Sequence, residues 1–112
     1  MVASAAAVWL TEATSGFVLA DSAKANYISY CATCHGNSGN ADGPTASQIR
    51  TRPAKLADCA RMSKVSDGTL FKVIEDGGSA AHLSNDMPAW NEVFAPPDIK
   101  KLVAYIRTFC KK

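Results

Sequence analysis

The stretch Cys31-Ala32-Thr33-Cys34-His35 sets the organisation of this chain of 112 residues. Its spacing, Cys-x-x-Cys-His, is the attachment signature for c-type haem. At the end of a helix, positions i, i+3 and i+4 project to one side. Two thiols can then reach the vinyl groups along one porphyrin edge, while the adjacent imidazole turns beneath the ring to bind iron. The stretch therefore predicts one haem c, covalently attached through Cys31 and Cys34, with His35 as an iron ligand.

Two other uses of a Cys-x-x-Cys pair fit the sequence less well. Structural zinc would need two further ligands at matching spacing, and the chain has no second Cys-x-x-Cys and no His-x-x-x-His. A thioredoxin-like redox pair would lie in an alternation of strands and helices, which this sequence lacks. Covalent haem is therefore the favoured interpretation.

Length and charge exclude several classes of protein. A chain of this length forms one domain with a modest core, to which a haem would add a large apolar group. The net charge of +2 and the lack of a Lys/Arg run give no indication of nucleic-acid binding. No uncharged apolar stretch approaches the roughly 20 residues that span a bilayer, so we predict no transmembrane segment.

Residues 1–20 differ from the rest because they contain no Lys or Arg. We predict a partly helical N-terminal extension here, followed by a haem domain over residues 21–112. A signal-peptide remnant is the alternative, although a basic n-region is missing and Glu12 interrupts the apolar run. The extension would pack on its own domain or mediate docking or dimerisation with a second chain through Trp9, Leu10, Phe17 and Leu19.

The periodicity predicts three to four helices with long loops and no strand. A first helix begins with Asp21 or Ser22 as N-cap, carries the haem motif at its end and stops at Gly36. A second covers residues 66–76, and a short helical turn is expected near residues 46–50. The last helix begins at Pro96 or Pro97. It carries an apolar stripe at helical spacing: Ile99, Leu102, Val103, Ile106, Phe109 and Cys110.

Three residues are candidates for the second axial position of the iron. Met87 lies 52 residues after His35 in a loop between helices, and Pro88 stiffens the backbone that holds its sulfur. A thioether ligand stabilises ferrous iron. Met62 is more readily explained as a core residue. His82 lies in a flexible, solvent-facing loop and could take the position if Met87 were lost.

Two further residues are candidates for binding the haem. A metal-bound imidazole normally donates its other ring N–H to a fixed acceptor. A carbonyl at Pro44 would suit that role, although a simple turn proline is an equal alternative. Arg50 and Arg52 could each pair with a haem propionate. Arg52 is preferred because Pro53 restricts its backbone, and exposure of both to solvent is the alternative.

Basic residues also lie on the last helix. Lys100, Lys101 and Arg107 could bias the docking of a redox partner. A helix face that is simply solvated is the commoner explanation.

Four features occur in the order found in class I cytochromes c, and most closely in small bacterial monohaem members. The resemblance covers residues 21–112 and rests on Cys31-x-x-Cys34-His35, Gly43-Pro44, Met87-Pro88 and the amphipathic last helix.

The resemblance implies an all-α cytochrome c fold, in which N- and C-terminal helices cross near one covalently attached haem. It implies His35 and Met87 as axial ligands, the Pro44 carbonyl as the acceptor for His35, and Trp90 near the haem edge. The extension over residues 1–20 departs from the minimal family pattern, as do the two remaining cysteines.

Cys59 and Cys110 are those remaining cysteines. A disulfide between them would close a loop of about 50 residues and contribute around 3–4 kcal/mol in the chain-entropy model. Such a bond fits an oxidising compartment, and buried thiols are the alternative.

These observations predict a periplasmic electron-transfer protein that is not an enzyme. Its partners would be a donor dehydrogenase or reductase and an acceptor oxidase or reductase. One alternative is a cytochrome subunit of a larger oxidoreductase complex. Another is a haem enzyme or sensor with an open sixth coordination site, against which Met87 argues.

Overall fold

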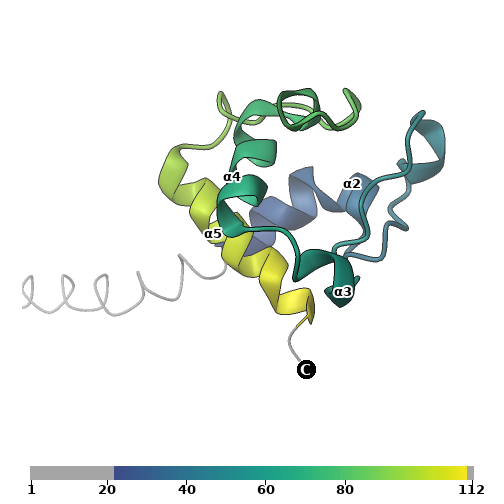
Figure 1. Cartoon of the computed structure of the whole chain (residues 1–112), viewed down its shortest axis with the longest axis horizontal. Coiled ribbons are helices and arrows are strands. Elements are labelled where there is room, and N and C mark those ends of the chain that lie inside the picture. Colours follow the sequence, from purple (N-terminus) through teal and green to yellow (C-terminus); the bar gives the residue numbers. More distant parts are fainter. Residues whose placement is uncertain (1–21, 111–112) are drawn as a thin grey trace, which may run out of the picture.

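The computed structural model describes residues 22–110, and the prediction of an extension over residues 1–20 lies outside this range. Within it every regular element is helical, which confirms the predicted all-α fold (Figure 1). A helix over residues 22–30 comes first. The later elements are α2 (Ala32–His35), η1 (Ala46–Gln48), α3 (Cys59–Met62), α4 (Asp67–Asp76), η2 (Gly78–Ala81), α5 (Pro96–Arg107) and η3 (Thr108–Cys110).

The predicted first helix is present in two pieces with a turn at Cys31 between them. Backbone hydrogen bonds continue across the turn, from Cys31 N to Tyr27 O at 2.8 Å and from His35 N to Cys31 O at 2.9 Å. Gly36 ends α2 with a φ of 85°, where its N–H donates to Ala32 O. A left-handed residue at this position favours glycine, so the sequence-based stop is confirmed.

Helix α5 supplies one side of the core and crosses the helix over residues 22–30 (Figure 1). Its predicted apolar stripe is confirmed, because Ile99, Leu102, Val103 and Ile106 are all buried. Tyr27 is fully buried between the two helices, and its ring centroid lies 5.4 Å from that of Tyr105 and 5.1 Å from that of Phe109. Aromatic pairs at these separations stabilise beyond the apolar area they bury.

The hydroxyl of Tyr27 also ties the first helix to the haem motif. It donates to the carbonyl of Gly36 at 2.7 Å, and both residues are buried. Burial, followed by the nearby Cys31, raises the pKa of Tyr27 well above its ordinary value of about 10. Tyr27 therefore binds its proton more tightly in the folded state than in the unfolded chain. The resulting stabilisation of the fold is complete below about pH 10. It is lost at higher pH, where the unfolded chain releases the proton.

We expect Tyr27→Phe to lower the free energy of unfolding by about 1–2 kcal/mol at neutral pH, because the buried Gly36 carbonyl loses its donor. The variant should also lose the part of the alkaline decline in stability that Tyr27 causes. Urea unfolding at pH 7 and at pH 10.5–11 (about one unit above the ordinary pKa) measures both effects. Tyr30→Phe is the matched control, since Tyr30 is 41% exposed. Equal stabilities of the two variants at pH 7 would contradict the role of this hydrogen bond.

Helix α4 begins and ends as the sequence predicts. The side chain of Ser66 accepts from Thr69 N at 3.1 Å, which satisfies an N-terminal donor of the helix. The helix ends at Gly77, whose φ is 88°. Ile74 is buried and faces the core shared with α5. Helix α4 thereby places the chain that follows it, which includes Met87.

Two short elements were not predicted. Helix α3 begins after Asp58, whose carboxylate accepts from Arg61 N at 3.2 Å. Met62, the last residue of α3, is 3% exposed and belongs to the core, which confirms its interpretation as a core residue. The second element is η2, within the region predicted to be a loop. Both are single turns, too short to show a periodic pattern.

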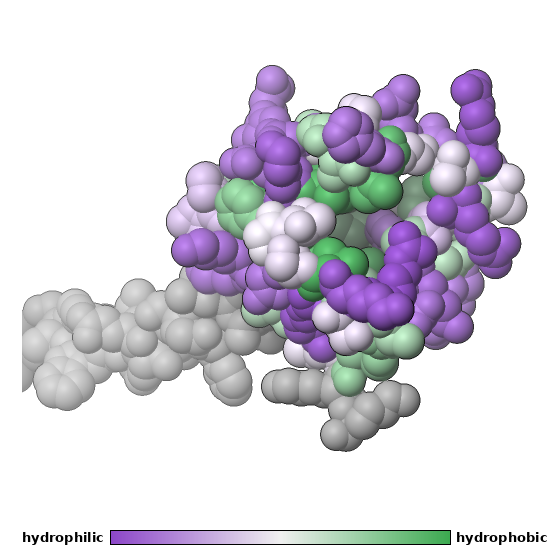
Figure 2. All heavy atoms as spheres, viewed as in Figure 1, coloured by the Kyte–Doolittle hydropathy of each residue, from purple (hydrophilic) through white to green (hydrophobic). Residues whose placement is uncertain are grey.

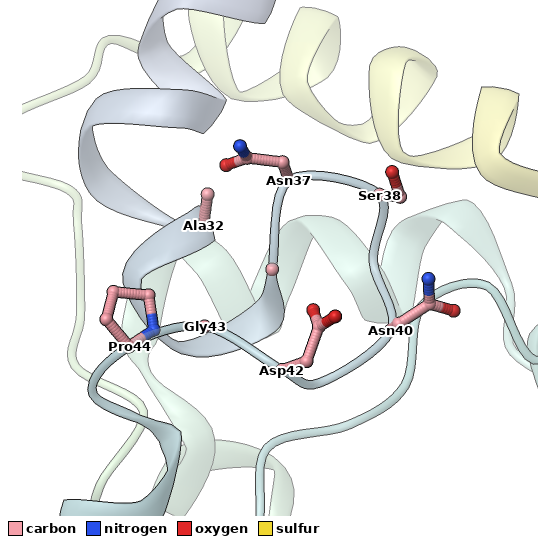
Figure 3. Close-up of a pocket in the computed structure, with 8 residues that line it drawn as sticks. Ala32, Asn37, Ser38, Asn40, Asp42, Gly43 and Pro44 are labelled. Carbon is pink, nitrogen blue, oxygen red and sulfur yellow. The ribbon is translucent and has the colours of Figure 1, made fainter.

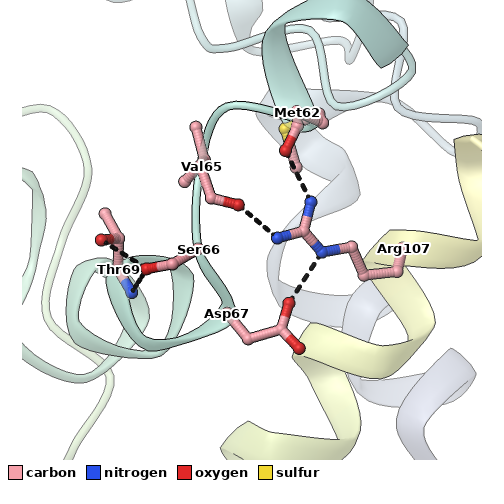
Figure 4. A network of polar contacts seen from close by, with 6 residues as sticks. All are labelled: Met62, Val65, Ser66, Asp67, Thr69 and Arg107. Carbon is pink, nitrogen blue, oxygen red and sulfur yellow. Dashed lines mark hydrogen bonds and ion pairs between the residues drawn. The ribbon is translucent and has the colours of Figure 1, made fainter.

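Arg107 joins the C-terminal part of α5 to the connection between α3 and α4 (Figure 4). Its Nε donates to Asp67 Oδ1 at 2.8 Å, and its Nη1 donates to Met62 O at 2.8 Å. Its Nη2 donates to Val65 O. The guanidinium is thus engaged within the fold. The sequence-based suggestion that Arg107 docks a redox partner is therefore replaced by a structural role.

Cys59 and Cys110 lie close together but are not joined by a disulfide in the structure. Cys59 Sγ lies 3.6 Å from Ala57 O and 3.8 Å from Cys110 O, and Cys110 Sγ lies 3.6 Å from Leu56 O. Both sulfurs lie within 4 Å of backbone oxygens. The prediction that Cys59 and Cys110 lie close together is confirmed, but the predicted disulfide is not present in the structure.

Candidate functional site

Cys31, Cys34 and His35 lie together at the end of the first helical segment, as their spacing predicts. Cys31 is 8% exposed and belongs to the core, whereas Cys34 and His35 are half-buried. Burial, reinforced by the neighbouring Cys34, raises the pKa of the Cys31 thiol to about 11. Cys31 is therefore a protonated thiol at neutral pH, held on the inner side of the motif.

The imidazole of His35 is oriented by a backbone carbonyl. Its Nδ1 lies 2.8 Å from Ala54 O. Burial lowers the pKa of His35, and the hydrogen bond to Ala54 opposes part of that effect. The ring is therefore neutral at pH 7. With Nδ1–H donating to Ala54, Nε2 carries the lone pair that can bind a metal.

The acceptor at His35 differs from the one that the resemblance implied. The expected partner was the Pro44 carbonyl, whereas the structure pairs His35 with Ala54. Pro44 instead lies against α2, where Gly43 N donates to Cys34 O at 3.2 Å and Thr45 N donates to Thr33 O at 2.8 Å. Pro44 lines a shallow polar pocket of about 230 Å³ with the loop that follows α2 (Figure 3).

Gly43 is required where the loop returns to α2. A Cβ at Gly43 would overlap the carbonyl oxygens of Ala32 and Thr33. We therefore expect Gly43→Ala to lower the free energy of unfolding by about 1–3 kcal/mol, as overpacking against a fixed backbone does. Gly68→Ala is the control, because a Cβ there has open space apart from one contact at 3.9 Å. Similar urea-unfolding midpoints for the two variants would show that the loop can move away from α2 at little cost.

Met87 lies in a loop that is anchored to the end of α4. Its carbonyl accepts from Gly78 N at 2.9 Å, and its N–H donates to Ser84 O at 3.3 Å. The side chain is half-buried and packs against the core. A Cβ at Gly77, where φ is already 88°, would lie 3.1 Å from Met87 O. The loop that carries Met87, called the methionine loop below, can therefore approach the end of α4 only because Gly77 and Gly78 have no side chains.

The face shown in Figure 2 is hollowed, and hydrophobic residues line the hollow. In the same view, Figure 1 shows α2 behind this place, with α4 and the chain that follows it on one side. An apolar hollow beside two thiols and an imidazole suits a flat, largely apolar ring. Within residues 22–110 no three His, Cys, Asp or Glu side chains gather to hold a bare metal ion. The residues present therefore fit a haem.

The other two candidates for the sixth ligand are placed differently. Met62 is buried in the core beside α3. His82 is exposed and adopts a left-handed conformation with a φ of 60° at the end of η2. Exposure of His82 agrees with its interpretation as a solvent-facing residue. Met87 is the half-buried candidate of the three.

Trp90 and Arg52 occupy contrasting environments. Trp90 is half-buried, with its ring centroid 5.5 Å from that of Tyr30 and 6.2 Å from that of Phe94. Its backbone N–H donates to Ile74 O. Arg52 is exposed, and its side chain makes no hydrogen bond or ion pair to residues 22–110. Their roles beside a haem remain predictions.

Two residues that organise the site were missed in the sequence. Ala54 follows Pro53, so the argument for a stiff carbonyl next to a proline applied to it as well as to Pro44. Asp86 precedes Met87, and its carboxylate accepts from the backbone N–H groups of Arg50 and Thr51, both at 3.1 Å. No local pattern indicated that these segments, some 35 residues apart, would meet.

None of the helices within residues 22–110 has the length and apolar character needed to cross a membrane.

Comparisons with known proteins identify the family of the chain. A family model described as cytochrome c oxidase, cbb3-type, subunit III matches residues 18–106. A solved structure of the c-type cytochrome KustC0563 is similar with a TM-score of 0.62 and 29% sequence identity, over 79% of this chain and 96% of that one. No curated protein sequence matches significantly. Because the family model covers most of the chain, including the haem motif and Met87, the chain belongs to this family of c-type cytochromes.

Proposed function

We propose that this protein carries one electron at a time on a single haem c, attached through Cys31 and Cys34 and bound axially by His35 and Met87. The family implies covalently bound haem c, electron transfer and redox partner proteins. When bound, the haem supplies an iron that alternates between the ferric and ferrous states. The observation that carries the proposal is the neutral, oriented His35 beside two thiols on one short helix.

The chain's own residues prepare both axial positions. Ala54 holds the His35 ring so that Nε2 is free to bind. On the other side, Gly78 holds the backbone of Met87 at the end of α4. A thioether favours the ferrous state and raises the reduction potential. With both positions taken by protein side chains, the site suits electron transfer better than binding of a substrate to iron.

Location and accessory residues complete the proposal. c-type cytochromes are typically exported, so we place this chain in the bacterial periplasm or an equivalent exported space. Arg52 is available to pair with a propionate because its guanidinium has no partner among residues 22–110. Trp90, which packs edge to face with Tyr30, is assigned to the haem edge.

The test is the absorption spectrum of the protein matured with haem. We expect a low-spin, six-coordinate spectrum in both oxidation states, with one covalent haem per chain. The ferric form should show the weak far-red band that reports methionine–iron bonding. A five-coordinate, high-spin spectrum that shifts with carbon monoxide would instead indicate an enzyme or a sensor with an open iron position.

A second candidate function is a cytochrome subunit of a larger oxidoreductase. The family model that matches the chain is described as a subunit of a cbb3-type cytochrome c oxidase, which favours this candidate specifically. Purification of the tagged protein from its own membranes distinguishes the two. A stoichiometric complex with haem–copper or other redox subunits would support the subunit role, and recovery as a single chain would support the free carrier.

A further inference from the structure

Asp86 makes a contact that the electron-carrier proposal does not itself require. Its Oδ2 accepts two backbone hydrogen bonds, from Arg50 N and Thr51 N, each at 3.1 Å. Its backbone N–H donates to Ser84 Oγ at 3.0 Å, which holds the backbone of the loop at Asp86. One side chain from the methionine loop thus satisfies two donors from a distant segment.

The two partners of Asp86 lie just before the residue that orients His35. Two residues separate Thr51 from Ala54 in the chain, and Ala54 O is the acceptor for His35 Nδ1. Pro53 stiffens the short stretch between them. The segment over residues 50–54 is therefore held by Asp86 at one end and holds His35 at the other.

Asp86 is also next to Met87 in sequence. A backbone hydrogen bond attaches the methionine loop to η2, from Gly78 N to Met87 O at 2.9 Å, and another attaches the chain just after the loop to α4, from Trp90 N to Ile74 O at 2.9 Å. The Asp86 carboxylate supplies a further attachment, to the segment that contains Arg50 and Thr51. Hydrogen bonds to an ionised acceptor are stronger than neutral ones, and two of them converge on one oxygen here.

We propose that Asp86 is a positioning residue that fastens the Met87 loop to the His35-orienting segment over residues 50–54, and so keeps the methionine on the iron. The inference rests on the proposed His35/Met87 ligation. Its consequence is a change in how readily an external ligand replaces Met87 on the iron. Without the carboxylate, the Met87 loop keeps only its attachments to α4 and η2, and an external ligand displaces the methionine more easily.

The test uses the haem-loaded, full-length protein and imidazole as the displacing ligand. Wild type, Asp86→Ala and Asp86→Asn are titrated with imidazole while the far-red band of the ferric form is followed. We expect Asp86→Ala to bind imidazole about tenfold more tightly or better, as loss of two charge-assisted hydrogen bonds implies. Asp86→Asn keeps an oxygen acceptor but loses the charge, so its imidazole affinity should lie between those of wild type and Asp86→Ala.

A control for charge is Glu92→Ala, which removes an exposed carboxylate without hydrogen-bond or ion-pair partners among residues 22–110. It should bind imidazole as wild type does. Urea unfolding of all variants separates positioning from general stability, because a merely structural role would lower the unfolding free energy without this selective gain in imidazole affinity. Equal imidazole affinity in Asp86→Ala and Glu92→Ala would overturn the proposal.

A second readout does not depend on methionine ligation. Amide hydrogen exchange at Arg50 and Thr51 should be faster in Asp86→Ala than in wild type, because the acceptor of both N–H groups is removed. If the wild-type far-red band were absent, the ligation proposal would fail while this readout still tested the contact. Unchanged exchange at both amides would overturn the role of Asp86 itself.

Discussion

Met87→Ala should abolish the far-red band of the ferric protein and lower its reduction potential by on the order of 0.1–0.2 V, a fraction of the roughly 0.8 V range that axial ligands control. The thioether stabilises the ferrous state, so its loss favours ferric iron. The loop should remain attached, because the substitution keeps both of its contacts. Gly78 N still donates to the backbone carbonyl of residue 87, and the Asp86 carboxylate still accepts from Arg50 N and Thr51 N. Visible spectroscopy and redox potentiometry measure the two effects.

Met62→Leu is the matched control for that experiment. Met62 is the buried core methionine, and a swap of similar volume costs less than about 1.5 kcal/mol. Its far-red band and potential should equal those of wild type. The assignment of Met87 would be wrong if its alanine variant kept the band, or if Met62→Leu lost it. Absence of the band in wild type, together with a low-spin spectrum that is lost in a His82 variant alone, would assign the ligand to His82.

Arg107→Ala should produce the largest loss of stability among the surface-accessible positions, about 2–4 kcal/mol. The substitution leaves the carbonyls of Met62 and Val65 without their donor and removes the ion pair with Asp67. Hydrogen bonds from a charged group contribute about 1.5–3 kcal/mol each, and the effects within one network are not additive. Urea unfolding of the haem-loaded protein measures the loss.

Two variants sharpen the Arg107 prediction. Arg107→Lys keeps the charge but cannot reach three acceptors with a planar fork, so it should recover only a minor part of the loss. Lys72→Ala removes the exposed i,i+4 pair with Asp76 and should change stability by less than about 0.5 kcal/mol. A loss below about 0.5 kcal/mol in Arg107→Ala would show that solvent replaces the guanidinium at these carbonyls.

The helices that bury an apolar stripe were predictable from sequence. The stripe of α5 recurs at helical spacing, and Ser66 and Gly77 mark the two ends of α4 by capping chemistry. Helix α3 and η2 were missed because one turn of helix carries no periodicity. Asp58, a good N-cap before α3, was the available local signal for the first of them.

Arg107 and Ala54 show why contacts between distant segments were harder to predict. On a helical wheel Arg107 is a polar residue at the end of α5, which equally fits a solvated face or a docking surface. Its partners, Met62 O and Val65 O, are backbone atoms about 40 residues away and leave no mark on the sequence. The acceptor for His35 was misassigned for the same reason, because two prolines offered equivalent stiff carbonyls.

The sequence by itself determined the haem motif, the all-α fold and the family, because these follow from side-chain chemistry at short spacing and from helical periodicity. The tertiary structure alone decided that Ala54 orients His35, that Arg107 binds carbonyls of the α3–α4 connection, that no disulfide joins Cys59 to Cys110, and that Asp86 contacts the backbone at Arg50 and Thr51. The physical reason is common to all four. Each depends on where a backbone carbonyl or N–H from a remote segment arrives, and every residue type carries those groups alike.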